Sequence, residues 1–231
     1  MKRLYREVAV TAERDGFGLA LDGKRVNTPA GAALVVRPRA LAEAIAEEWS
    51  AQGERVVPET MKLMQFAVTA LDRVVPARAA VIEQLVSYGE TDLLCYRAAE
   101  PADLVDRQVA MWQPLLDWAG LRFGAELTAI AGLMPQPQPA GALDALRAAL
   151  APVDALGLTG LLAAAGAAGS LILALALQEG RLSAEEVWAL SQLDETFQIE
   201  RWGEDEEAAA RRAALRADLV VAGRFLALAA S

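Results

Sequence analysis

A run of 22 residues without one charged side chain, Leu156–Leu177, most constrains how this chain can fold. As a single helix it would be about 33 Å long, enough to span a membrane. However, half of the run is Ala or Gly, and its flanks, Asp154 and Glu179, lack the Lys and Arg clusters that accompany many membrane spans. Glycines within the run would also weaken a helix. We therefore expect a central buried helix, preceded by a short helix and a turn, and no stable membrane insertion.

The first 37 residues have the pattern of β structure. Asp22-Gly23 is a strong signal for a two-residue hairpin turn, and the stretches Phe17–Leu21 and Lys24–Thr28 flank it as expected strands. A further short strand is expected at Ala33–Val36, after a turn that contains Pro29 and Gly31. These signals predict a small antiparallel, β-rich N-terminal domain at residues 1–37.

From Pro38 onward the apolar residues follow the spacing of helices. Leu41, Ile45 and Trp49 recur every four residues, as on one face of a helix. Pro101 begins another expected helix, which runs to about Gly120 and should kink or restart at Pro114. Residues 134–141 alternate Pro with Gln and predict an extended connection. We assign an α+β fold, with a larger all-helical domain at residues 38–231.

The composition excludes several kinds of active site. The chain has no His and one Cys, Cys95, so it can form neither a Ser–His or Cys–His nucleophile pair nor a zinc site built on these residues. Its glycines do not form a phosphate-binding motif. The net charge of −9 disfavours nucleic-acid binding. We expect no cofactor, no metal and no catalytic residues; the remaining enzymatic alternative is a carboxylate-dependent reaction.

An acidic, apolar stretch near the C-terminus is the candidate functional element. Ser183 begins an expected capping box, and we expect one helix from there to Gly203. Wound as one helix, it places Asp194 on one apolar face and Glu195 on another. A buried unpaired carboxylate is costly, so each of these groups must be paired, protonated or available to a partner.

Structural explanations of the same residues stay open. Asp194 and Arg201 lie about two turns apart on the expected helix, so they could form an ion pair that serves only the fold. Glu204 and Asp205 begin a last helix, and acidic side chains at a helix start interact favourably with its dipole. Trp49 and Trp202 are as compatible with a core as with a binding surface.

Seven blocks of sequence between Gly16 and Asp205 resemble one known family. In chain order they are GFGLALDGKRVNTP, LAEAIAEEWSAQGERVVPETM, AVTALDRV, YGETDLLCYRA, RQVAMWQPLLDW, GSLILALAL and LDETFQIERWGED. Each block alone is only modestly specific, whereas all seven in the same order are specific. Together they are similar to the assembly chaperones that handle the alpha subunit of the F-type ATP synthase.

The resemblance implies a non-enzymatic protein that holds the newly made alpha subunit until that subunit joins beta. It implies an important acidic residue before the FQ-x-x-x-WG segment, which corresponds to Asp194 or Glu195. We therefore expect a partner-binding surface, whose candidate residues are Asp194, Glu195, Trp202, Glu204, Asp205 and Trp49. The N-terminal sequence shows no targeting signal, so we expect a bacterial cytoplasm. We also expect the chain to be a monomer. A membrane-associated assembly factor is the second alternative.

Overall fold

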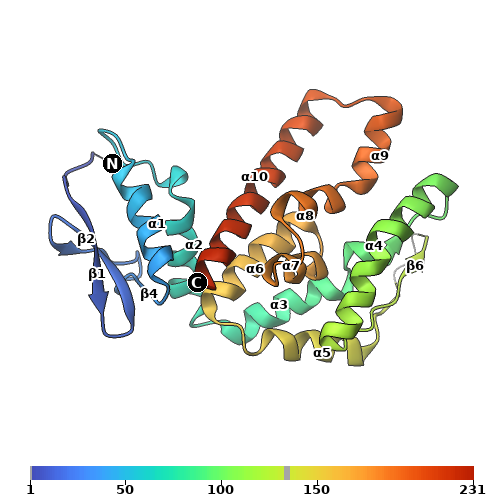
Figure 1. Ribbon diagram of the computed structural model, residues 1–231, viewed down its shortest axis with the longest axis horizontal. Helices are drawn as coiled ribbons and strands as arrows, with labels where there is room; N and C mark the ends of the chain where they lie inside the picture. The colour runs from blue at the N-terminus through green and yellow to red at the C-terminus, as the bar shows by residue number, and fades with distance from the viewer. Residues whose placement is uncertain (1, 133–135) are drawn as a thin grey trace. The chain divides into compact units, whose positions relative to one another are not determined.

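The computed structural model describes residues 2–132 and 136–231, and these residues form two compact units (Figure 1). The first unit combines Met1–Arg78 with the later segments Asp154–Gly160 and Arg224–Ser231. The second unit comprises Ala79–Val153 and Leu161–Gly223. Each unit is described below by itself.

The first unit contains the antiparallel sheet that the sequence predicts. Strand β1 (Val8–Glu13) pairs with β2 (Gly16–Leu21) in the register Val8 to Leu21. Strand β2 also pairs with the short strands β3 (Lys24–Arg25) and β4 (Val35–Val36). Asp22 and Gly23 both have positive φ angles, 47° and 75°, as the predicted two-residue hairpin turn requires.

Helices complete the first unit beyond residue 37. They are α1 (Arg39–Ser50), the short η1 (Pro58–Thr60), α2 (Lys62–Thr69) and η2 (Ala70–Val74), which is a π-helical turn. Their buried side chains share one core with those of the sheet and with Leu156 and Phe225 from the later segments. The boundary that we expected at residue 37 lies directly after the end of the last strand of the sheet, β4. The compact unit is larger, because it also contains the helices up to Arg78 and two later segments. That a separate folding domain ends at residue 37 stays a prediction.

The second unit is predominantly helical. Its helices, some of which extend into residues of the first unit, are α3 (Arg78–Glu90), η3 (Leu93–Cys95), α4 (Ala102–Phe123), α5 (Ala140–Leu150), α6 (Ala155–Ala168), α7 (Leu171–Gln178), α8 (Ala184–Ser191), α9 (Leu193–Trp202) and α10 (Glu206–Ala229). One short parallel pair, β5 (Tyr96–Arg97) with β6 (Ile130–Ala131), adds strand structure to it. The antiparallel sheet followed by a mostly helical region confirms the predicted α+β fold.

The uncharged run forms two helices, α6 and α7, with a turn between them, in the order that we expected, although α6, with 14 residues, is longer than the expected short helix. The chain turns at Gly169, whose φ is 67°, and Ser170 then caps α7 by accepting a hydrogen bond from the Leu173 N–H at 3.0 Å. Every residue of α7 from Leu171 to Leu177 is buried, so the run does supply core. Across the described part of the chain, no helix has both the length and the hydropathy that crossing a membrane requires.

Two further expectations about the second unit need correction. Helix α4 continues through Pro114 and ends at Gly124, whose left-handed φ of 74° closes the last turn, and not at Gly120. Helix α5 begins at Ala140, so the end of the expected proline-rich connection is already helical. Residues 134 and 135 of that connection lie outside the described residues.

Candidate functional site

The acidic stretch forms two helices, α8 and α9, and the prediction of one continuous helix is wrong. Ser183 and Glu186 form the expected capping box at the start of α8. The helix then breaks at Gln192, whose φ and ψ of −107° and 19° are not helical. The break changes the direction of the chain between Leu190 and Asp194, so one helical projection cannot describe both sides of it.

Asp194 lies in the first turn of α9 and contacts α4. Its Oδ1 accepts a hydrogen bond from Nε2 of Gln108 at 2.7 Å. Arg201 instead pairs with Asp103 of α4, so the alternative of an Asp194–Arg201 ion pair is wrong. The break at Gln192 leaves α9 short, and its charged side chains reach the neighbouring helix rather than one another.

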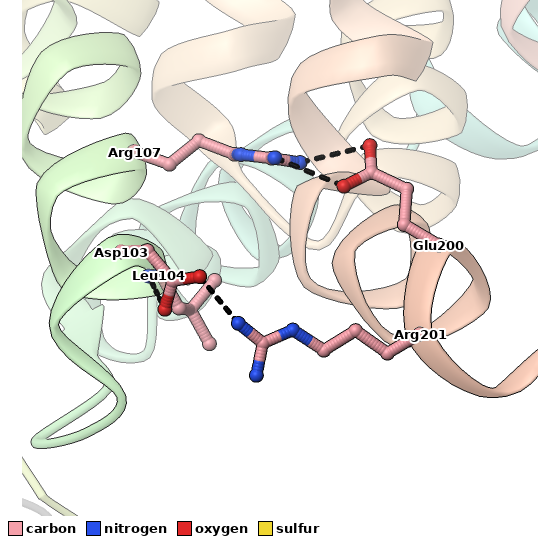
Figure 2. A network of polar contacts seen from close by, with 5 residues as sticks. All are labelled: Asp103, Leu104, Arg107, Glu200 and Arg201. Atoms are coloured by element: carbon pink, nitrogen blue, oxygen red, sulfur yellow. Dashed lines mark hydrogen bonds and ion pairs between the residues drawn. The ribbon is translucent and has the colours of Figure 1, made fainter.

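Charged side chains join α9 to α4 at the surface. Arg107 donates two hydrogen bonds to the carboxylate of Glu200, at 3.0 and 2.9 Å, and Asp103 pairs with Arg201 (Figure 2). Both guanidinium groups lie against the ring of buried Phe197, with Cζ 5.3 Å and 4.2 Å from its centroid. Exposed pairs of this kind contribute little stability individually, and here two of them join α9 to α4.

The remaining acidic candidates differ in their surroundings. Glu195 is exposed, and the side chain of Trp202, at the end of the same helix, is 75% exposed. Glu204 pairs with Arg212 at 3.0 Å, and Asp205 accepts a hydrogen bond from the Ala208 N–H at 2.8 Å as a cap of α10. The contacts of Glu204 and Asp205 therefore also have a structural purpose, as their position at a helix start predicts.

Trp49 belongs to the first unit, whereas the acidic candidates and Trp202 belong to the second, and only 9% of Trp49 is exposed. Its ring packs edge-on against Tyr5 with the centroids 5.5 Å apart, and the Tyr5 hydroxyl donates to the Trp49 carbonyl at 2.7 Å. Such burial favours the core alternative for Trp49, whereas the exposure of Trp202 favours a binding surface.

Two buried polar residues behind Asp194 were not among the expected site residues. Gln108 is 1% exposed and Arg97 is 7% exposed, and a hydrogen bond of 2.8 Å joins the Arg97 guanidinium to the Gln108 carbonyl. Gln108 precedes the fully buried Trp112 by one helical turn. A Gln on the apolar face of a helix was the one sequence signal that could have identified it.

The groups around Asp194 have opposing effects on the pKa of its carboxyl. Its pKa is raised, chiefly because burial disfavours the ionised form and also because Glu195 is close. The hydrogen bond from Gln108 and the positive charge of Arg97 lower this pKa and so act in the opposite direction.

The two units differ in net charge. The sequence of the second unit has 20 acidic and 9 basic side chains, a net charge of −11, while that of the first unit has a net charge of +2. The net negative charge of the chain thus comes from the unit that contains Asp194.

The described residues offer no alternative chemistry. Among them, no group of three or more His, Cys, Asp or Glu side chains could hold a metal ion. Cys95 is buried, and burial raises the pKa of its thiol to about 12, which makes it unreactive at neutral pH. What the site does offer is the exposed Trp202 on the same helix as Asp194 and Glu195, and Trp is enriched in surfaces that bind other proteins.

The chain combines one sheet-containing unit with one predominantly helical unit, and the exposed Trp202 belongs to the helical unit. A model of the ATP12 chaperone protein family matches residues 2–120, just over half of the chain. The chain therefore belongs to the ATP12 family of assembly chaperones for the ATP synthase. The family is non-enzymatic, which confirms the prediction that the resemblance gave.

Solved structures extend the similarity over the whole chain. Atp12 from Paracoccus denitrificans is 42% identical, with a TM-score of 0.95 over 99% of this chain and 98% of that one. A candidate chaperone from Agrobacterium tumefaciens is also 42% identical, with a TM-score of 0.92 over 98% of this chain and 85% of that one. The mitochondrial protein atp12 of Schizosaccharomyces pombe is 22% identical over 223 residues, which are 90% of this chain and 75% of that protein.

Proposed function

We propose that this chain binds the unassembled alpha subunit of the F-type ATP synthase, shields its apolar interface and releases it to the beta subunit. Membership of the ATP12 family supports the choice of the ATP synthase, and the resemblance in sequence supports the alpha subunit. The structural observation in favour is the exposed Trp202 at the C-terminal end of α9, a helix whose first turn contains Asp194 and Glu195.

Physical chemistry indicates how such a surface would work. An unassembled subunit exposes an interface that promotes aggregation. The Trp202 ring would supply apolar contact, while Asp194 and Glu195 would pair with Arg or Lys side chains of the client. Glu204 and Asp205 are secondary members of this surface because they already have partners within the chain. The burial of Trp49 leaves it a role in the core.

Co-expression with the alpha subunit tests the proposal. We expect a soluble one-to-one complex in size-exclusion chromatography, which dissociates when the beta subunit is added. Trp202→Ala should weaken the complex about tenfold or more, as loss of an aromatic contact at the centre of an interface does.

Leu121→Ala is the matched control, because Leu121 is 90% exposed on another helix, α4, and its truncation should leave binding unchanged. An alpha subunit that aggregates while the wild-type chain elutes alone would contradict the proposal. Equal loss of binding in both variants would argue against a site centred on α9.

The proposal also places the chain as a monomer in a bacterial cytoplasm. The similarity to proteins from Paracoccus denitrificans and Agrobacterium tumefaciens supports a bacterial member. Cell fractionation and light scattering check the two parts separately. Sedimentation with membranes and a need for detergent would favour the membrane-associated alternative instead.

A further inference from the structure

Gln108 is a buried side chain with one partner for each polar end. Its Oε1 accepts a hydrogen bond from the Ala98 N–H at 2.8 Å, and its Nε2 donates to Oδ1 of Asp194 at 2.7 Å. Its own carbonyl accepts from Nη1 of Arg97 at 2.8 Å. The first of these contacts orients the amide, so that its NH₂ group is directed at Asp194.

Arg97 is a buried cation held by neutral groups. Its Nε donates to the Leu94 carbonyl at 2.8 Å, and its Nη2 lies 3.5 Å from Oε1 of Gln113. Among the described residues, no carboxylate lies within ion-pair distance of it, yet Asp194 is near enough to interact with its charge. A buried guanidinium without a counter-charge is costly, so the proximity of Asp194 stabilises both groups.

One carboxylate oxygen of Asp194 is held by a hydrogen bond, and the other is available to a partner. Its Oδ1 is bound to Gln108, whereas no described residue donates a hydrogen bond to Oδ2, which is not enclosed and so reaches solvent. An isolated surface carboxylate would rotate among several conformers, and ordering it on binding would cost free energy. A carboxylate that is already oriented and ionised avoids that cost.

We propose that Gln108 and Arg97 are positioning residues, which hold Asp194 ionised and present its Oδ2 to a cationic side chain of the client. This inference rests on the proposed function for the identity of the client. It goes further in naming the chemical group that is recognised, a guanidinium or ammonium, and the two buried residues that prepare the site for it. Neither residue touches the client.

The first test needs no client. The pKa of the Asp194 carboxyl is measured by carbon-detected NMR during a pH titration, with Asp194→Asn to assign the signal. Gln108→Met removes the donated hydrogen bond and Arg97→Met removes the charge, so each should raise this pKa by about one unit. Arg97→Lys retains a positive charge and should keep the pKa close to the wild-type value.

Gln138→Met is the matched control for loss of a buried amide. Gln138 is 6% exposed and, like Gln108, uses both ends of its amide, in this case with the backbone of Thr128. It should lower the thermal stability about as much as Gln108→Met while leaving the Asp194 pKa unchanged. Should Gln108→Met fail to fold, Gln108→Glu preserves the volume and the acceptor for Ala98, and should raise the pKa of Asp194 more strongly.

The second test uses the alpha subunit. Gln108→Met should weaken the complex about as much as Asp194→Asn, and the double variant should be no weaker than Asp194→Asn alone. An unchanged Asp194 pKa in both the Gln108 and the Arg97 variants would overturn the inference, whatever their stability. If the pKa shifts occur but wild-type protein binds no alpha subunit, the proposed client is wrong and the positioning of Asp194 stands.

Discussion

At the scale of single residues, Asp92 shows how a buried carboxyl group can link two segments. It is fully buried, and its two oxygens accept hydrogen bonds from the Leu94 and Ile172 N–H groups, each at 3.1 Å. One bond caps η3 and the other lies at the start of α7. Burial nevertheless raises its pKa to about 6, so the cost of removing the charge from water exceeds the gain from these donors.

The raised pKa of Asp92 predicts a pH dependence of stability. Since the folded state binds this proton more tightly than the unfolded state, the contribution of Asp92 is fully present below about pH 4 and is lost as the pH rises to 6. The stability advantage of wild type over Asp92→Asn should therefore be about 2 kcal/mol smaller at pH 7 than at pH 4. Urea unfolding at both pH values measures it. A constant difference would show that the group does not titrate in this window.

At the scale of secondary-structure elements, α9 depends on charged contacts more than on apolar ones. Only Leu193 and Phe197 of its ten residues are buried. The pairs with α4, Arg107–Glu200 and Asp103–Arg201, lie at the surface and are accessible to salt. A short helix with this little core should open locally more easily than α7, whose residues are almost all buried.

Arg107→Ala should loosen α9 without unfolding the unit. We expect a cost of at most about 1 kcal/mol, because the pair is exposed, and faster hydrogen exchange confined to α9. Arg107→Glu should have a larger effect, since it places two carboxylates opposite each other. The charge-swapped variant with Glu200→Arg should restore much of the protection. Exchange in α9 that is unchanged in Arg107→Glu would mean that the ion pair does not hold the helix.

At the scale of the whole molecule, the chain returns to its first unit at the very end. Arg224–Ser231 belongs to that unit, where Phe225 is fully buried and meets the ring of Phe66 edge-on, with centroids 5.1 Å apart. Leu226 packs so closely against Gly160 that a Cβ there would lie 2.6 Å from it. The stability of the sheet-containing unit thus depends on residues far from the N-terminus in sequence.

Phe225→Ala should therefore destabilise the first unit by about 3–5 kcal/mol, as removal of a large aromatic side chain from a core does. Native-state hydrogen exchange of the buried amides of α1, which belong to the same core, measures the loss. Val220→Ala is the control on the same helix, because Val220 is 43% exposed and its truncation should cost little. An equal effect of both substitutions would contradict a core role for Phe225.

Local sequence signals predicted much of the architecture because they act over a few residues. The Asp22-Gly23 turn specifies its hairpin through backbone conformation alone, and the Ser183 capping box begins its helix in the same way. The break at Gln192 was missed because no Gly or Pro marks it. At Pro114 α4 does not restart, so of the two expected alternatives only a kink stays a prediction.

The sequence by itself therefore determined that an antiparallel, β-rich segment precedes a mostly helical one, the acidic character of the second unit and, through the resemblance, the family. Only the tertiary structure decided which polar groups meet. Gln108 and Asp194 are 86 residues apart in sequence, and Asp103 and Arg201 are 98 apart. It also separated Trp49, which is buried, from Trp202, which is exposed. The physical reason is that turns and caps depend on neighbouring residues, whereas burial and ion pairing depend on the packing of distant helices.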